Sequence, residues 1–344
     1  MILWDVNSGE PIMKFKGHKA DILKTIFSPK NNLIASCSKD KIVYLWDLKS
    51  YRNCYELKGH RDSVKCIDFS PNGLQLASAS NKTLILWDMS DNFRGNQIIK
   101  NQFDEADIIN LKYASESPIL YLISFDRSLH VFNTKDLEPI EEPKSVFQSQ
   151  KIDKIKLASN ENNLVCSTDD NQIIIRDLLN YDVVAMSEKQ TTDNISALSI
   201  SKNNNLIAAG SQDNVIMLYE IVSNNVKLIK GPLKYHSKAI TVLCFSNDNK
   251  LLASGSKDNT LAIWNLTLDK PLFEGLKHHT DAVKVICFSK DGDKLISAGK
   301  DGRVIIWNAR TGERDHIFEL KNSIQHFSLS YMNGNLLCGD IKGK

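Results

Sequence analysis

The sequence predicts an all-β protein built from repeated four-stranded blades, a β-propeller. The main observation is a dipeptide in which a large side chain precedes an acid or amide. Its successive copies lie 42, 41, 45, 44, 43, 45 and 43 residues apart. A period of about 40 to 45 residues with this ending is typical of propeller blades. The eight copies are Trp4-Asp5, Trp46-Asp47, Trp87-Asp88, Phe132-Asn133, Arg176-Asp177, Tyr219-Glu220, Trp264-Asn265 and Trp307-Asn308.

The repeat at 236–275 shows the unit in full. After a histidine come the apolar segments AITVLCFS, LLASGS and LAIW, separated by the turns NDNK and KDNT, and a last strand is expected around PLFE. Short apolar runs punctuated by Asn, Asp, Gly and Ser are antiparallel strand signals, and no segment has convincing helical spacing. The same register predicts the first strands near 22–27, 64–69, 108–113, 152–157, 195–200, 240–245, 283–288 and 324–329.

The two ends of the sequence complement each other. NLLCGDIKGK stops after a second strand and MILW starts as a third strand, and joined they parallel the segment at 295–313. We therefore expect one domain, 1–344, whose eighth blade is shared by the ends, which removes exposed sheet edges. The alternative is a segment of a longer array. The expected blades span about 18–57, 60–100, 104–147, 148–187, 191–230, 236–275, 279–319, and 320–344 with 1–16.

Composition narrows the function classes. A net charge of +2 gives no overall attraction to nucleic acid or to an anionic membrane. The seven cysteines are odd in number and lack CxxC spacing, which favours structural thiols in a reducing, intracellular compartment, cytoplasmic or nuclear. We expect neither a secretory signal nor a membrane-spanning segment, because no apolar run approaches about 20 residues. No phosphate-binding loop or metal-ligand cluster is recognisable, so we expect no cofactor and no metal.

The repeats resemble those of the WD40 family over essentially the whole chain. That resemblance implies a hydrogen-bonded tetrad within a blade: a His before the first strand, a Ser or Thr on the second, an Asp in the next turn and the Trp of the third. Three repeats match fully and a fourth has Asn in place of Asp. The sets are His18, Ser36, Asp40 and Trp46; His236, Ser254, Asp258 and Trp264; His279, Ser297, Asp301 and Trp307; and His60, Ser78, Asn81 and Trp87.

The chemistry of such a tetrad is structural. The carboxylate orients the imidazole, which bonds the hydroxyl, and the indole N–H needs a buried partner. A hydrolase triad would need one nucleophile in a cleft with an oxyanion hole, so several copies at one register argue against catalysis. We expect no enzymatic activity.

The three repeats over 104–230 depart from the pattern. Asp104, Gln148 and Thr191 stand at their His positions, and their Trp positions hold Phe132, Arg176 and Tyr219. The apolar strands remain, so we expect these blades to form without tetrads and to open more easily.

The resemblance also implies that other proteins or peptides bind at the top face, the blade ends that carry the turn between the second and third strands. The family's contact positions flank the first apolar residue of strand one and precede the turn Asp. If the ring closes, we expect one basic sector there, made of Lys39, Lys65, Lys257, Lys284 and Lys300.

The third and fourth blades differ at the same positions. An exposed Phe or Ile beside acidic groups suits a peptide with an apolar residue and a cation. The alternative is an ordinary solvated surface, because isolated exposed apolar residues are common. The residues are Asp107, Ile109, Phe125, Asp153 and Asp169, with Lys151 as the exception.

We expect a non-enzymatic scaffold that gathers proteins on the top face, and two other functions compete. WD40 adaptor-binding members of cullin-type ubiquitin ligases often end a blade with Trp-Asp-x-Arg, which WNAR at 307–310 and WDLK at 46–49 approach imperfectly. The lysine sector also fits RNA or ribosome-assembly binding, which should weaken steeply with salt. The sequence names no partner.

Overall fold

The computed structural model describes residues 1–30, 32–49, 52–90, 96–102, 108–114, 118–124, 129–139, 152–157, 163–168, 170–177, 183–222, 225–268, 270–273, 276–320, 324–329 and 335–340. Within these ranges the regular elements are all strands, β1 to β30, arranged in eight antiparallel sheets. The chain divides into unit 1, Met1–Gln148 with Gln325–Lys344, and unit 2, Ser149–Ile324. This all-β architecture is the class that the sequence predicts.

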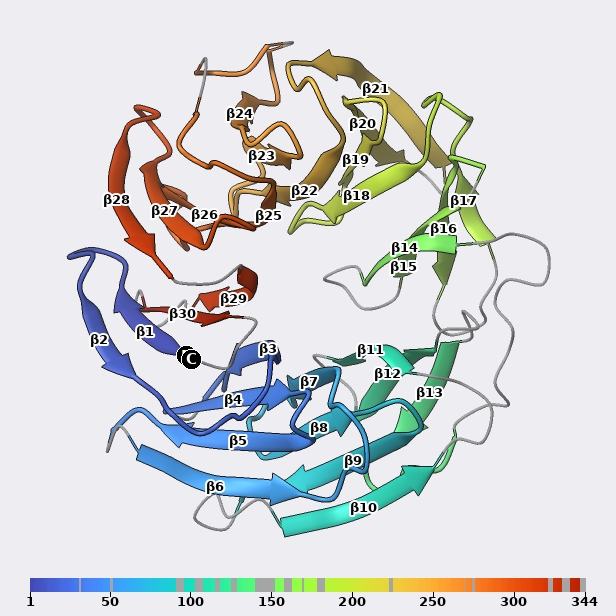
Figure 1. Ribbon diagram of the computed structural model, residues 1–344. Coiled ribbons are helices and arrows are strands. Elements are labelled where there is room, and N and C mark those ends of the chain that lie inside the picture. Colours follow the sequence, from blue (N-terminus) through green and yellow to red (C-terminus); the bar gives the residue numbers. More distant parts are fainter. Residues whose placement is uncertain are drawn as a thin grey trace. The chain divides into compact units, whose positions relative to one another are not determined.

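Unit 1 contains the first, second, third and eighth blades (Figure 1). The first is β3 (Ile22–Phe27), β4 (Leu33–Ser38), β5 (Ile42–Asp47) and β6 (Arg52–Lys58); the second is β7 (Cys66–Phe69), β8 (Gln75–Ala79), β9 (Thr83–Asp88) and β10 (Asn96–Gln102). The third is β11 (Ile108–Tyr113), β12 (Ile119–Ser124) and β13 (Leu129–Asn133); the eighth is β29 (Ile324–Leu329), β30 (Asn335–Asp340), β1 (Ile2–Asp5) and β2 (Pro11–Lys14).

Unit 2 contains the fourth to seventh blades. The fourth is β14 (Ile152–Leu157), β15 (Asn163–Thr168), β16 (Ile173–Asp177) and β17 (Val183–Met186); the fifth is β18 (Ile195–Ile200), β19 (Leu206–Ser211), β20 (Val215–Val222) and β21 (Asn225–Lys234). The sixth is β22 (Ile240–Phe245), β23 (Leu251–Ser256) and β24 (Leu261–Asn265); the seventh is β25 (Val283–Phe288), β26 (Lys294–Gly299), β27 (Arg303–Asn308) and β28 (Arg314–Glu319).

The eighth blade joins the two ends of the sequence. β1 lies between β2 and β30, and its register with β30 pairs Ile2 with Cys338 and Trp4 with Leu336 (Figure 1). Met1 and Leu3 are buried and pack with Trp46 of the first blade. Complementary strand patterns at the two ends therefore become one sheet, with its inner strands from the carboxyl-terminal segment.

The core of each unit lies between successive blades, which pack face to face. In unit 1, Leu45 of the first blade packs against Ile67 of the second; in unit 2, Ile263 of the sixth packs against Ile286 of the seventh. Strands apolar on both faces, such as β9 and β27, are accordingly buried over four or more consecutive residues. Because both faces of such a strand are buried, its sequence is a continuous run of apolar residues.

Glycine permits two close approaches between neighbouring blades of unit 2. A Cβ added to Gly255 of β23 would lie 2.7 Å from Cγ1 of Val283, the first residue of β25. A side chain there would have to push the neighbouring strand away. Gly210 stands in the same relation to Ile240, with a Cβ distance of 2.5 Å to its Cγ2.

Two strand predictions are wrong in detail. The strand expected at 64–69 begins at Cys66, because the Val64 N–H donates to Ser38 O of the first blade at 3.1 Å. The last strand expected around PLFE is not regular, so the described sixth sheet has three strands with isolated bridges at Pro271 and Leu276. Proline has no N–H to donate to a ladder, and the pairing at Pro271 is a single isolated bridge with Trp264.

Candidate partner-binding surface

The first blade brings His18, Ser36, Asp40 and Trp46 into one network. His18 Nδ1 lies 2.8 Å from Asp40 Oδ2 and its Nε2 lies 2.8 Å from Ser36 Oγ. Trp46 Nε1 donates to the same hydroxyl at 2.8 Å. The tautomer with its proton on Nδ1 satisfies every group, because the ring then donates to the carboxylate and accepts from the serine O–H.

The sixth and seventh blades repeat this geometry in unit 2. His236 and His279 lie 2.8 and 2.9 Å from Ser254 and Ser297 through Nε2. Oδ2 of Asp258 and Oδ2 of Asp301 lie 3.2 and 2.9 Å from Nδ1 of these rings. Trp264 and Trp307 donate to the two hydroxyls, each at 2.9 Å. His236 Nδ1 has a further contact, with Thr260 Oγ1 at 3.0 Å, that the sequence comparison of repeats missed.

The second blade departs from the expected set. His60 and Trp87 meet Ser78 at 2.7 and 2.8 Å, but His60 Nδ1 contacts Ser80 Oγ at 3.0 Å rather than Asn81. The buried Oδ1 of Asn81 has no hydrogen-bond partner in the described part of the chain. Trp87 lies nine residues after its serine and Trp46 ten after its own, so the shorter turn places a serine hydroxyl where the carboxylate would be.

The turn that carries each tetrad carboxylate is held from several sides. Asp258 accepts from the Ser237 N–H at 2.8 Å, and the next residue, Asn259, has a φ of 71°. Burial acts to raise the pKa of Asp258, but hydrogen bonds from His236, Thr260 and that N–H outweigh it and hold the pKa below its ordinary value. The carboxylate thus stays ionised and fixes the turn between the second and third strands.

The tetrads do not form a catalytic site. The serine side chains of the full sets have no exposed area, and each hydroxyl already binds a histidine and a tryptophan. A nucleophile needs access to a substrate and a base free to take its proton. Within the described residues no three His, Cys, Asp or Glu side chains are placed to hold a metal ion. No helix in the described ranges is long and apolar enough to span a membrane.

The fourth and fifth blades lack the tetrad, as their sequences predict. Cys166 and Ala209 occupy the serine register opposite Ile174 and Met217. Thr191 replaces the histidine of the fifth blade, yet the next residue, Thr192, still donates its N–H to Asp213 Oδ2 at 3.0 Å. The turn therefore keeps its carboxylate anchor without an imidazole.

Three lysines of unit 2 gather at the turn ends of the sixth and seventh blades, and we call them the lysine cluster. Lys257 and Lys300 directly precede the tetrad carboxylates, and Lys284 is the second residue of β25. Partial burial lowers the pKa of Lys284, and the charges of Lys300 and Lys257 lower it further. The three ammonium groups are therefore close enough to repel one another.

The other predicted contact positions are not in this cluster. Lys39 of unit 1 is ion-paired with Asp21 at 2.7 Å, which neutralises part of its charge locally, and Lys65 belongs to the same unit. One sector of five lysines stays a prediction. Phe125, Asp107, Lys151 and Asp169 lie outside the described residues, as do the side chains of Ile109 and Asp153.

Comparisons with known families agree with the repeat pattern. The model of the WD domain, G-beta repeat, matches residues 9–47 and 51–88. The β-propeller model of the nucleolar protein 10-like N-terminal domain matches 149–340, more than half of the chain. No curated protein sequence matches significantly.

Solved structures share the fold at low sequence identity. Sqt1 from Chaetomium thermophilum is 18% identical over 95% of this chain and 96% of that chain, with a TM-score of 0.79. The same protein bound to the N-terminus of the ribosomal protein L10 is 18% identical over 95% of this chain and 98% of that chain, with a TM-score of 0.76. The computationally designed protein Ika8 is 20% identical over 95% of this chain and 96% of that chain, with a TM-score of 0.76. At such identities the likeness establishes the fold alone.

Proposed function

Since the chain belongs to the WD40-repeat β-propellers and, through residues 149–340, to the nucleolar protein 10-like N-terminal domains, we propose that it is a non-enzymatic scaffold. In this proposal an acidic segment of a partner protein binds at the lysine cluster, Lys257, Lys284 and Lys300. The site is built from two adjacent blades whose turns are fixed by intact tetrads.

The observation that carries the proposal is the placement of three lysines, Lys257, Lys284 and Lys300, close together at the turn ends of adjacent blades. Burial and the charges of Lys300 and Lys257 lower the pKa of Lys284, with only Asp281 acting in the opposite direction. No ion pair joins the three ammonium groups to a carboxylate within the described residues. A bound carboxylate-rich segment would relieve this repulsion, since complementary potentials favour association.

The support from relatives is of a general kind. The structure of Sqt1 with the N-terminus of ribosomal protein L10 is an example of this fold binding a terminal protein segment. A platform of rigid turns suits such binding, because little ordering is needed when the segment docks.

The test compares two triple charge reversals in unit 2. Lys257→Glu/Lys284→Glu/Lys300→Glu should slow association of a hexaglutamate peptide about tenfold or more at low salt, because clustered charges act mainly on association rate. The control replaces three exposed lysines in the turns between first and second strands of the fifth to seventh blades. Those turns lie at the opposite ends of the antiparallel sheets. The control residues are Lys202, Lys250 and Lys290.

Equal rates for the two triple variants would contradict the proposal. The RNA alternative has its own outcome in the same experiment. If a uridine oligonucleotide of equal charge bound more tightly than the peptide, with a steep loss of affinity as salt rises, phosphate recognition would replace peptide recognition.

The ubiquitin-ligase alternative rests on Arg310. Its guanidinium is largely exposed but already pairs at 2.6 Å with Asp293, which lies in the turn between β25 and β26 of the same blade. A ligase adaptor would have to share or break this pair. Co-purification of an adaptor that is lost in Arg310→Ala would favour the alternative over the scaffold proposal.

A further inference from the structure

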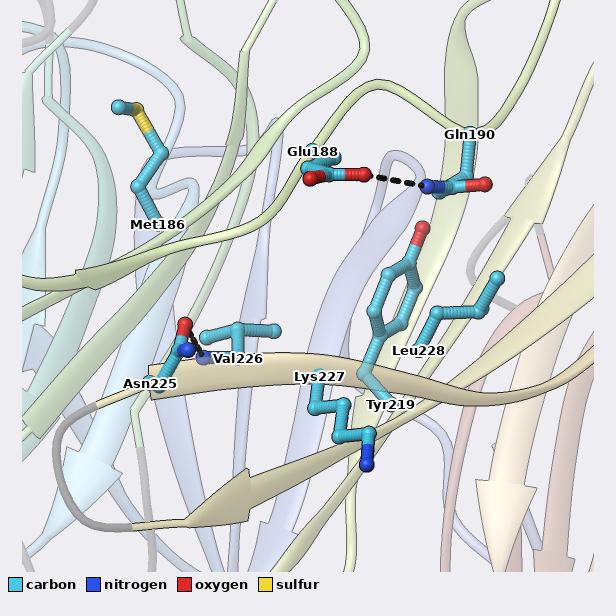
Figure 2. A pocket seen from close by; sticks show the side chains of 8 residues that line it. All are labelled: Met186, Glu188, Gln190, Tyr219, Asn225, Val226, Lys227 and Leu228. Atoms are coloured by element: carbon cyan, nitrogen blue, oxygen red, sulfur yellow. Dashed lines mark hydrogen bonds between the residues drawn. The ribbon is translucent and has the colours of Figure 1, made fainter.

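A polar hollow opens between the outer strands of the fourth and fifth blades, both in unit 2. Its volume is about 270 Å³. Met186 at the end of β17 and the following Glu188 and Gln190 line one side, and Tyr219 of β20 with Leu228 of β21 line the other (Figure 2). The two sheets are otherwise packed together through an apolar core, so the hollow is a local gap in that packing.

Tyr219 gives the hollow an unusual floor. The corresponding Trp264 donates to Ser254, but in the fifth blade Ala209 stands at the serine register. The Tyr219 side chain has no exposed area, and its hydroxyl has no partner among the described residues. Burying a hydroxyl without a hydrogen bond is costly, so a ligand that displaced the side chain covering it and supplied a hydrogen-bond partner would relieve the cost.

Two side chains with hydrogen-bond acceptors, Glu188 and Gln190, also line the hollow. Figure 2 shows Glu188 and Gln190 beside the tip of the Tyr219 ring, whereas the Lys227 ammonium lies at the other end of the ring in this view. The Gln190 amide donates to Glu188 Oε2 at 3.4 Å. This bond leaves Glu188 Oε1 and the amide oxygen of Gln190 for donors from outside.

We propose that the hollow binds an arginine side chain of a partner protein. A guanidinium has five N–H donors and no acceptor, pairs with a carboxylate through two parallel bonds, and is planar enough to enter between two sheets. Met186 and Leu228 would contact its aliphatic stem. A carboxylate in the same place would be repelled by Glu188.

A protein partner, rather than a free guanidine compound, fits the surroundings of the hollow. Strands β17, β20 and β21, which contribute to the hollow, expose large apolar side chains to solvent. Such residues grouped beside a pocket provide contact area around a central polar anchor. They are Val183, Met186, Val222 and Ile229.

The experiment uses two blocked pentapeptides, Gly-Ser-Arg-Ser-Gly and its citrulline counterpart, titrated into the full chain by NMR. Citrulline keeps the shape but removes the charge. The arginine peptide should bind about tenfold more tightly than the citrulline peptide, as expected when a charge-assisted bond becomes neutral. Glu188→Gln should weaken arginine binding by a similar factor. The control Glu313→Gln, at a hollow of the seventh blade, should leave it unchanged.

A second variant separates binding from folding. Tyr219→Phe should melt at the same or a higher temperature than the wild type, because the hydroxyl makes no bond in the free protein, and should bind the arginine peptide more weakly. The lysine-cluster variant should bind normally, so this proposal and the proposed function can fail separately. Three results would overturn the proposal: equal binding of the two peptides, no binding of the arginine peptide at millimolar concentration, or a lower melting temperature of Tyr219→Phe with unchanged binding.

Discussion

Asp258 orients His236 and fixes the turn that carries Lys257, so a substitution of Asp258 should destabilise the fold. Asp258→Ala removes the acceptor of a buried imidazole and should lower the free energy of unfolding by about 2–4 kcal/mol. Asp170, the equivalent residue of the fourth blade, instead accepts a hydrogen bond from Thr168 and pairs with a largely exposed Lys189. Asp170→Ala should cost less than about 1 kcal/mol. Urea denaturation measures both, and equal losses would mean that the tetrad does not stabilise its blade.

The pH dependence of stability should also show the contribution of the ionised Asp258 carboxylate. The folded pKa of Asp258 lies below its ordinary value of 3.8, so its contribution is fully present above that value and is lost as pH falls through the folded pKa. We expect the stability difference between wild type and Asp258→Asn to shrink as pH is lowered from 5 to about 2. A difference that stays constant over this range in urea titrations would exclude the carboxylate as its source.

In the second blade, the repeat pattern assigned the wrong residue as the partner of His60 Nδ1. Alignment by spacing assigned Asn81 to the carboxylate position, because an alignment cannot tell which side chain a shortened turn brings to the ring. The structure places Ser80 there. Ser80→Ala should therefore cost about 1 kcal/mol, the usual contribution of one hydrogen bond, and Asn81→Ala should lie within about 0.5 kcal/mol of the wild type. The reverse order in thermal unfolding would restore the assignment made from sequence.

At the scale of elements, the strand β1 ties the ends of unit 1 together. Leu3 of β1 is fully buried, whereas Ile12 of the neighbouring β2 is 37% exposed. Leu3→Ala should cost about 2–5 kcal/mol through the cavity it leaves, and Ile12→Ala less than about 0.5 kcal/mol. Deletion of residues 1–16 should expose the edge of β30 and cause aggregation. A soluble deletion variant with unchanged cooperative unfolding would show that the shared sheet is dispensable.

Most strands could be predicted from the sequence, because apolar runs of five or six residues alternate with turn residues at a fixed period. Seven of the eight first strands begin where the register places them, and only β7 starts later. The irregular edge of the sixth blade could not be predicted, since the pattern around Pro271 resembles its neighbours. Loss of the tetrad near Tyr219 was visible in the sequence. The hollow beside it was not, because its size depends on how two outer strands pack.

At the scale of the whole molecule, local charge differs from the average charge. The chain carries a net charge of only +2, yet Lys257, Lys284 and Lys300 lie close together on adjacent blades. Composition alone therefore could not predict an anionic partner, whereas the repeat register could place the three lysines at equivalent turn ends. Closure of the two units into one ring stays a prediction from the repeat.

The most direct test of the central claim, that this propeller is a binding scaffold whose lysine cluster captures acidic partners, is affinity purification from native extract with quantitative mass spectrometry. Wild type is compared with Lys257→Glu/Lys284→Glu/Lys300→Glu and with the matched reversal of Lys202, Lys250 and Lys290. We predict a set of proteins with acidic segments that the wild type and the control retain and the cluster variant loses. Identical partners for all three proteins would contradict the account.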